Sequence, residues 1–117
     1  MNLYLGGDKK GMDWVAWCVR TGNGRRRTYA SDITGITADV LKSLKVIYGI
    51  KWAETSHTID SVHVMVKYHA GTLAFAIPFA SADKRYTKED SIVPEERVKD
   101  VTASLRAMIM QEMNGNR

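Results

Sequence analysis

The chain has 117 residues, of which 44% are hydrophobic, and it carries a formal net charge of +4. This size and apolar content suit the core of one domain, so we expect a single domain over residues 1–117. No stretch approaches the roughly 20 apolar residues that cross a bilayer, and the only cysteine, Cys18, excludes an internal disulfide and a cysteine-rich metal site. We therefore expect a cytoplasmic protein that does not enter a membrane.

The excess positive charge lies in one short stretch, RTGNGRRR at residues 20–27. This stretch contains no acidic residue, and its arginines are Arg20, Arg25, Arg26 and Arg27. The chain has 17 Lys and Arg against 13 Asp and Glu, so removing these four arginines leaves 13 of each sign. A neutral body with one positive stretch is typical of a localised site for an anionic partner.

The residues around the arginines predict a β-hairpin. Strands are predicted at 2–6 and at 12–20, and the second has apolar residues on both faces. Asn23 and its flanking glycines tolerate the positive φ angles of a two-residue turn, so RRRTYAS, residues 25–31, is predicted to return as a third strand. Because burying unpaired guanidinium groups is unfavourable, this Arg-rich hairpin should protrude past the core.

Helical periodicity begins after the predicted hairpin. Its apolar stripe consists of Val40, Leu41, Leu44, Ile47 and Tyr48. Thr37 is the predicted N-cap, and Gly49 suits the position just past the C-cap. Residues 50–54 then fit either a short strand or a continuation of the helix, and we favour the strand.

A second hairpin is predicted over residues 61–80, SVHVMVKYHAGTLAFAIPFA. With a turn at residues 70–71, Tyr68 pairs with Leu73, and one face of the hairpin is apolar along its whole length. The opposite face is mixed, and Ala74 and Ala76 leave room there for a helix or a second protein. Pro78 cannot donate to a sheet ladder, so the second strand is predicted either to be an edge or to end at Pro78.

Pro94 and the glutamates after it predict the start of the last helix. Its apolar stripe is Val98, Val101, Leu105, Met108, Ile109 and Met113. The element order is therefore β-β-β-α-(β)-β-β-α. This order predicts an α+β domain whose mainly antiparallel sheet is packed by two helices, with the Arg-rich hairpin protruding from it.

The chain carries no motif of a catalytic, metal or cofactor site. Its three histidines recur every six residues, and His63 and His69 would share a strand face. Six residues at ~3.3 Å each separate that pair by about 20 Å, too far for one ion. The glycines of LGGDKKGM lack the P-loop pattern. We expect a binding protein without metal or cofactor rather than an enzyme.

Three strands followed by a helix at ADVLKSL resemble the opening of ribonuclease H-like domains, with Asp39 in the place of a helix acid. The resemblance covers roughly the first half of the chain and rests on element order. It implies a magnesium-dependent nuclease with further acids on the first and fourth strands. Here only Asp8 follows the first strand, and VHVMVKYH has no acid, so a nuclease is the least favoured hypothesis.

Nucleic-acid binding is the leading hypothesis, because arginine is the usual contact to phosphate and guanine and a two-stranded hairpin fits the major groove of DNA. The predicted contacts to DNA or RNA are Arg20, Arg25, Arg26 and Arg27, joined by a second basic segment with Lys84, Arg85 and Tyr86. The alternative is a protein-binding module: a small inhibitor or accessory protein on a larger partner, or a homodimer. Its contacts would be the same arginines or the small-residue face of residues 72–80.

Overall fold

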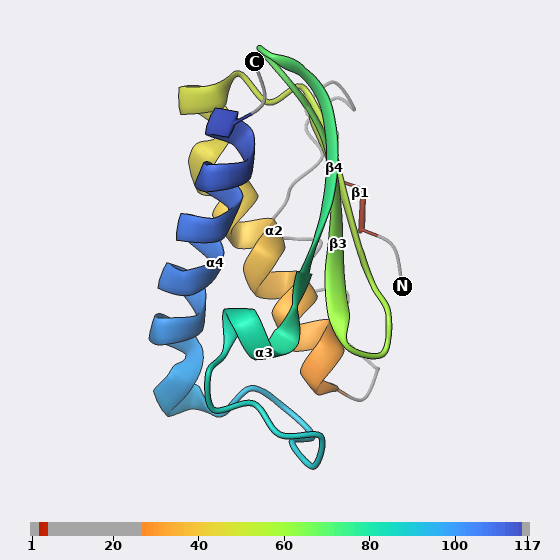
Figure 1. Cartoon of the computed structure of the whole chain (residues 1–117), viewed down its shortest axis with the longest axis vertical. Coiled ribbons are helices and arrows are strands. Elements are labelled where there is room, and N and C mark those ends of the chain that lie inside the picture. Colours follow the sequence, from red (N-terminus) through yellow and green to blue (C-terminus); the bar gives the residue numbers. More distant parts are fainter. Residues whose placement is uncertain (1–2, 5–26, 116–117) are drawn as a thin grey trace.

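The computed structural model, described for residues 3–4 and 27–115, packs its helices against one face of an antiparallel sheet (Figure 1). The elements are β1 (Leu3–Tyr4), α2 (Tyr29–Tyr48), β2 (Trp52–His57), β3 (Ser61–Tyr68), β4 (Gly71–Pro78), α3 (Phe79–Ala82) and α4 (Glu95–Gly115). The strands lie in the order β1-β2-β3-β4, and each neighbouring pair is antiparallel. This confirms the predicted α+β class, with two long helices packed on the sheet. None of the helices in the described ranges is long and apolar enough to cross a membrane.

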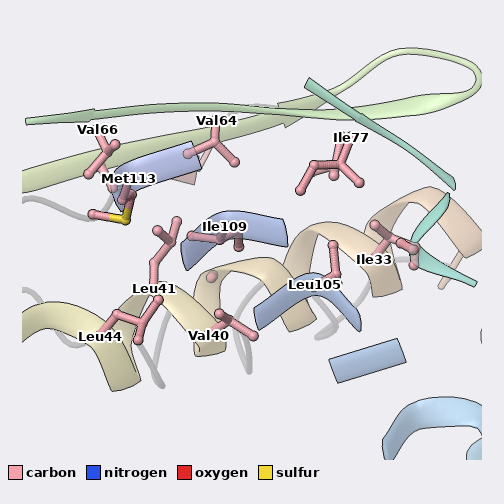
Figure 2. Close-up of a cluster of buried hydrophobic side chains, with 14 of the residues drawn as sticks. Ile33, Val40, Leu41, Leu44, Val64, Val66, Ile77, Leu105, Ile109 and Met113 are labelled. Atoms are coloured by element: carbon pink, nitrogen blue, oxygen red, sulfur yellow. The ribbon is translucent and has the colours of Figure 1, made fainter. Parts of the chain in front are cut away.

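The core lies between the sheet and the two long helices. Figure 2 shows Val64 and Ile77 of the sheet on one side of this core, with Leu41 of α2 and Ile109 of α4 opposite them. Successive strand residues point to opposite faces, so the alternate residues of β3, such as Met65, lie on the face that the helices leave uncovered. Among the described residues, the sheet therefore has one face buried by the helices and one face that the helices leave open.

Helix α2 begins at Tyr29, eight positions before Thr37, the predicted N-cap. Thr28 is its N-cap: the Thr28 hydroxyl accepts from the Ser31 N–H at 3.0 Å, and the Ser31 hydroxyl accepts from the Thr28 N–H at 2.9 Å. The prediction of strand at 25–31 is therefore wrong from Arg27 onward, because Arg27 and Thr28 belong to no strand and the helix begins at Tyr29. The rest of the predicted Arg-rich hairpin, including its turn, lies outside the described residues.

The predicted N-cap, Thr37, is instead buried within α2, and its hydroxyl donates to the Ile33 carbonyl at 2.8 Å. Threonines and Gly35 lower the helix propensity of this segment, but Tyr29 and Ile33 extend the buried stripe toward the N-terminus. Packing of that stripe decides the helix start. At the other end, Ile47 is 63% exposed and does not belong to the stripe as predicted.

The end of α2 was predicted correctly at Gly49, whose φ of 61° and ψ of 42° are left-handed. The strand predicted at 50–54 exists, but it covers Trp52–His57. The shift arises because Ile50 still belongs to the helix end: its N–H donates to the Lys45 carbonyl at 3.0 Å.

The hairpin of β3 and β4 forms with a register two residues from the prediction. Val66 pairs with Leu73, and Tyr68 pairs with Gly71. The tip is tied to α2, because the His69 N–H donates to the Tyr48 carbonyl at 3.0 Å. A shift of two residues leaves every side chain on its predicted face, so the apolar face is confirmed while the pairing is wrong. Among the described strands, β4 lies at the edge of the sheet and ends at Pro78, as predicted.

Helix α4 follows Pro94, as predicted. Val101, Leu105, Ile109 and Met113 are buried, and Val98 and Met108 are partly buried against the same core.

Candidate functional site

The structure describes four of the predicted contact residues: Arg27, Lys84, Arg85 and Tyr86. Arg20, Arg25 and Arg26 lie outside the described residues. The described positions belong to two segments, one just before α2 and one in the loop between α3 and α4. The geometry of each segment decides whether the two could form one site.

Arg27 is attached to the first turn of α2. Its Nε and one Nη donate to the two carboxylate oxygens of Asp32, at 3.0 and 2.7 Å. This hydrogen bond and the charge of Asp32 raise the pKa of Arg27. Asp32 also accepts from the Val93 N–H at 3.0 Å, which joins the start of α2 to the loop before α4. The Arg27 side chain remains 56% exposed, so it is oriented by Asp32 and still accessible to a partner.

The loop after α3 is fixed by the buried carboxylate of Asp83, which is 4% exposed. One of its oxygens accepts from the Tyr29 hydroxyl at 2.6 Å and forms an ion pair with Arg97 at 3.0 Å. The other accepts from the Arg85 N–H at 3.1 Å. Burial and the hydrogen bond to Asp83 raise the pKa of Tyr29 far above that of a free tyrosine. Asp83 therefore joins α2, α4 and the segment that carries the predicted basic residues.

Arg97 contributes a second ion pair, with Asp90 at 2.9 Å. Asp90 also accepts from the Thr87 N–H at 2.9 Å, and these two contacts hold the pKa of Asp90 below its ordinary value. The Arg97 side chain is 11% exposed, and its Nε has no partner among the described residues. The negative charge of Asp90 is thus directed at Arg97 rather than at the exposed lysine and arginine nearby.

Tyr86 places its segment next to the start of α2. Its ring centroid lies 4.6 Å from that of Tyr29 and 5.6 Å from that of Phe79. Since Tyr29 is two residues after Arg27, this contact brings residues 84–86 and Arg27 to the same end of the molecule. Figure 1 shows α3 and its following loop beside the N-terminal end of α2. We call the end that carries Arg27 and residues 84–86 the basic end.

Lys84 and Arg85 are both exposed at the basic end. Arg85 lies 3.6 Å from Asp100, but both side chains are more than half exposed, so this pair leaves Arg85 available to other anions. A groove of about 390 Å³ adjoins them, with Asp100, Ala103 and Ser104 of α4 on its other side, so its lining carries both signs of charge. The basic end therefore combines accessible cations with an adjoining concave surface.

The polar contacts around Asp83 could not be predicted from sequence reasoning. Tyr29 and Asp83 are 54 residues apart, and no periodic pattern or motif links them. The one usable signal was Tyr86, an apolar ring within the basic stretch KRYTK, whose burial would anchor that stretch to the core. The structure shows this anchoring, since Tyr86 is partly buried.

The described ranges contain no group of three or more His, Cys, Asp or Glu side chains that could hold a metal ion. Asp39, the acid on which the ribonuclease H-like resemblance depends, is exposed in the middle of α2 rather than near a helix start. Comparison of the chain with protein-family models, with curated proteins and with solved structures finds no match.

Proposed function

We propose that this protein binds nucleic acid through the basic end, with the arginines at positions 20, 25, 26 and 27 acting together with Lys84 and Arg85 on phosphate groups. The observation that carries the proposal is the contact between Tyr86 and Tyr29, which brings two basic segments about 60 residues apart in sequence to one end of the fold. Arg25 and Arg26 directly precede Arg27 in the chain. Phosphate contact requires such accessible, clustered cations.

The contacts assign different roles to the residues of the basic end. Asp32 holds one edge of the Arg27 guanidinium, which reduces the conformational entropy that Arg27 would lose on binding a phosphate. Tyr86 is packed against Tyr29 and Phe79, so it positions Lys84 and Arg85 rather than offering a free ring to a base. Single-strand binding relies on exposed aromatic platforms, so a duplex backbone is the better match for this end.

The test is fluorescence anisotropy of labelled duplex DNA, single-stranded DNA and RNA over a salt series. Two double variants remove cations from the two segments, R25A/R26A and K84A/R85A, and Arg27 is kept because it bonds to Asp32. The matched control, K42A/K51A, removes two exposed lysines elsewhere. Each test variant should weaken duplex binding and reduce the slope of log K against log salt by about 1.8, while the control leaves the slope unchanged.

Two results would contradict the proposal. If K84A/R85A binds like the wild type while R25A/R26A loses binding, the two segments do not form one site. If the wild type binds no nucleic acid even at low salt, nucleic acid is not the partner. The arginines would then be candidate anchors for a protein, to be sought by pull-down with R25A/R26A as the control.

A further inference from the structure

The outer edge of β4 is an unprotected sheet edge within the described residues. β4 is the last strand of the sheet and covers Gly71–Pro78, eight residues without a charged side chain. No strand of the described ranges pairs with its outer side. Long, uncharged edge strands offer a row of free backbone groups to another strand, and proteins usually shield them with charges, bulges or covering segments.

The backbone groups that point outward follow from the hydrogen bonds of the hairpin. The Phe79 N–H donates inward, to the Asp60 carbonyl at 2.8 Å. The direction of the backbone groups alternates along an antiparallel strand, so the N–H and C=O groups of Leu73, Phe75 and Ile77 also point toward β3. The N–H groups of Thr72, Ala74 and Ala76 therefore point away from the sheet. All three of these residues are exposed.

The side chains of β4 are also incompletely covered on the face that packs against the helices. Leu73 and Phe75 are only partly buried, whereas Val64 and Val66, their partners in β3, are 2% and 0% exposed. The two apolar side chains at the edge would gain burial from a further strand. On the open face, Ala74 and Ala76 are too small to obstruct such a strand.

We propose that the strand that pairs with β4 is β4 of a second copy of this chain, arranged antiparallel about a twofold axis at Ala74. In this register Ala74 lies opposite the partner's Ala74, and Thr72 opposite the partner's Ala76. All of these residues have outward-pointing backbone groups, so each pair exchanges both main-chain hydrogen bonds. Leu73 lies opposite the partner's Phe75 at a non-hydrogen-bonded position, where cross-strand side chains are closest.

A second copy suits this edge because the strand is complementary to itself. No like charges meet across the axis, and the same two partly buried side chains cover each other on both sides of it. One strand pair buries less than the ~1,200 Å² of a stable complex, so the dimer should be weak and concentration-dependent. The proposal does not depend on the basic end, which follows the C-terminal end of β4, beyond Pro78 and α3.

The first measurement is sedimentation equilibrium from about 10 µM to about 1 mM, a range that spans weak association. The dimer fraction should rise with concentration, and protection of the Thr72, Ala74 and Ala76 amides from hydrogen exchange should rise with it. Ala74→Lys places two ammonium groups beside each other at the axis and should abolish the dimer. Thr72→Lys, opposite the partner's Ala76, adds the same charge without this contact and should weaken the dimer less.

Cysteine cross-linking in a Cys18→Ser background tests the register. Ala74→Cys should form a disulfide-linked dimer, because paired Cα atoms in this position are about 5.5 Å apart. Thr72→Cys should not, because the two copies of residue 72 are offset by four residues, about 13 Å.

Four results would overturn the proposal. A monomer at all concentrations, or a dimer that survives Ala74→Lys, would show that β4 does not pair with itself. Equal cross-linking by Thr72→Cys and Ala74→Cys would exclude the twofold axis at Ala74. Protection of the three amides that does not depend on concentration would show that the edge is covered within one chain.

Discussion

At the scale of single residues, Asp83 is the carboxylate that joins the start of α2, the start of α4 and the loop between α3 and α4. It is buried, it accepts hydrogen bonds from the Tyr29 hydroxyl and the Arg85 N–H, and it forms an ion pair with Arg97. A buried carboxylate in contact with a mostly buried guanidinium is stable only while both are present, because removing one leaves the other charge uncompensated.

We predict that Asp83→Asn lowers the free energy of unfolding by about 3 kcal/mol, since Arg97 loses one of its two carboxylate partners in a buried position. Urea unfolding at neutral pH measures this change. Asp100→Asn is the matched control: it breaks an exposed pair with Arg85 and should change stability by less than about 0.5 kcal/mol. Adding Arg97→Met to Asp83→Asn should recover part of the loss. Equal effects of Asp83→Asn and Asp100→Asn would show that Asp83 is not a structural ion-pair partner.

At the scale of elements, one glycine lies within α2 and a second is its C-cap. Gly49, at the C-cap, has a φ of 61°, and an added Cβ would lie 3.6 Å from the His69 Cβ, an ordinary contact. The strain of an alanine there is therefore conformational rather than steric. Gly35 lies inside the helix, and an added Cβ would meet nothing within 4 Å.

The same substitution should consequently have opposite effects at the two positions. We predict that Gly49→Ala destabilises the protein by about 1 kcal/mol, because alanine disfavours the left-handed conformation. Gly35→Ala should stabilise it by roughly 0.5–1 kcal/mol, because alanine has the higher helix propensity. Thermal and urea unfolding of both variants measure the two changes. A loss of stability from Gly35→Ala would mean that the helix is distorted at this position.

The elements also show which features the sequence determines locally. The C-cap at Gly49, the edge position of β4 and the stripe of α4 were predicted, because each depends on one residue type or one periodicity. The start of α2 was not, because the hydroxyls of Thr28 and Ser31 form its cap only once packing has selected a helix there.

The register of the β3–β4 hairpin depends on a contact distant in sequence, from His69 to Tyr48, which turn propensities do not contain. In the candidate site too, some features follow from local sequence and others from contacts distant in sequence. The cations of residues 84–85 are evident from composition, whereas their position at the same end of the molecule as Arg27 depends on Tyr86, Tyr29 and Asp83. Local patterns therefore identified the charged segments, and tertiary contacts determined how they come together.

At the scale of the whole molecule, two tyrosine hydroxyls donate hydrogen bonds to the last turn of α4, at the end opposite the basic end. The Tyr68 hydroxyl donates to the Met113 carbonyl at 2.8 Å in a buried position, and the Tyr48 hydroxyl donates to the Asn114 side chain at 2.7 Å. Figure 1 shows the C-terminal end of α4 beside the tip of the β3–β4 hairpin. The last carbonyls of a helix have no donor within the helix. The Tyr68 hydroxyl is the donor for the Met113 carbonyl, in place of water.

We predict that Tyr68→Phe lowers the free energy of unfolding by about 1–2 kcal/mol, because it leaves the buried Met113 carbonyl without a donor. Tyr48→Phe removes the same atom, but the exposed Asn114 amide can bond to water, so its effect should be below about 0.5 kcal/mol. Urea unfolding compares the stability of the two variants.

Both variants should keep the salt slope of any nucleic-acid binding, because the basic end lies at the other end of α2. Equal destabilisation by the two variants would contradict the difference in burial on which the prediction depends. A changed salt slope would show that the two ends are coupled through the helices.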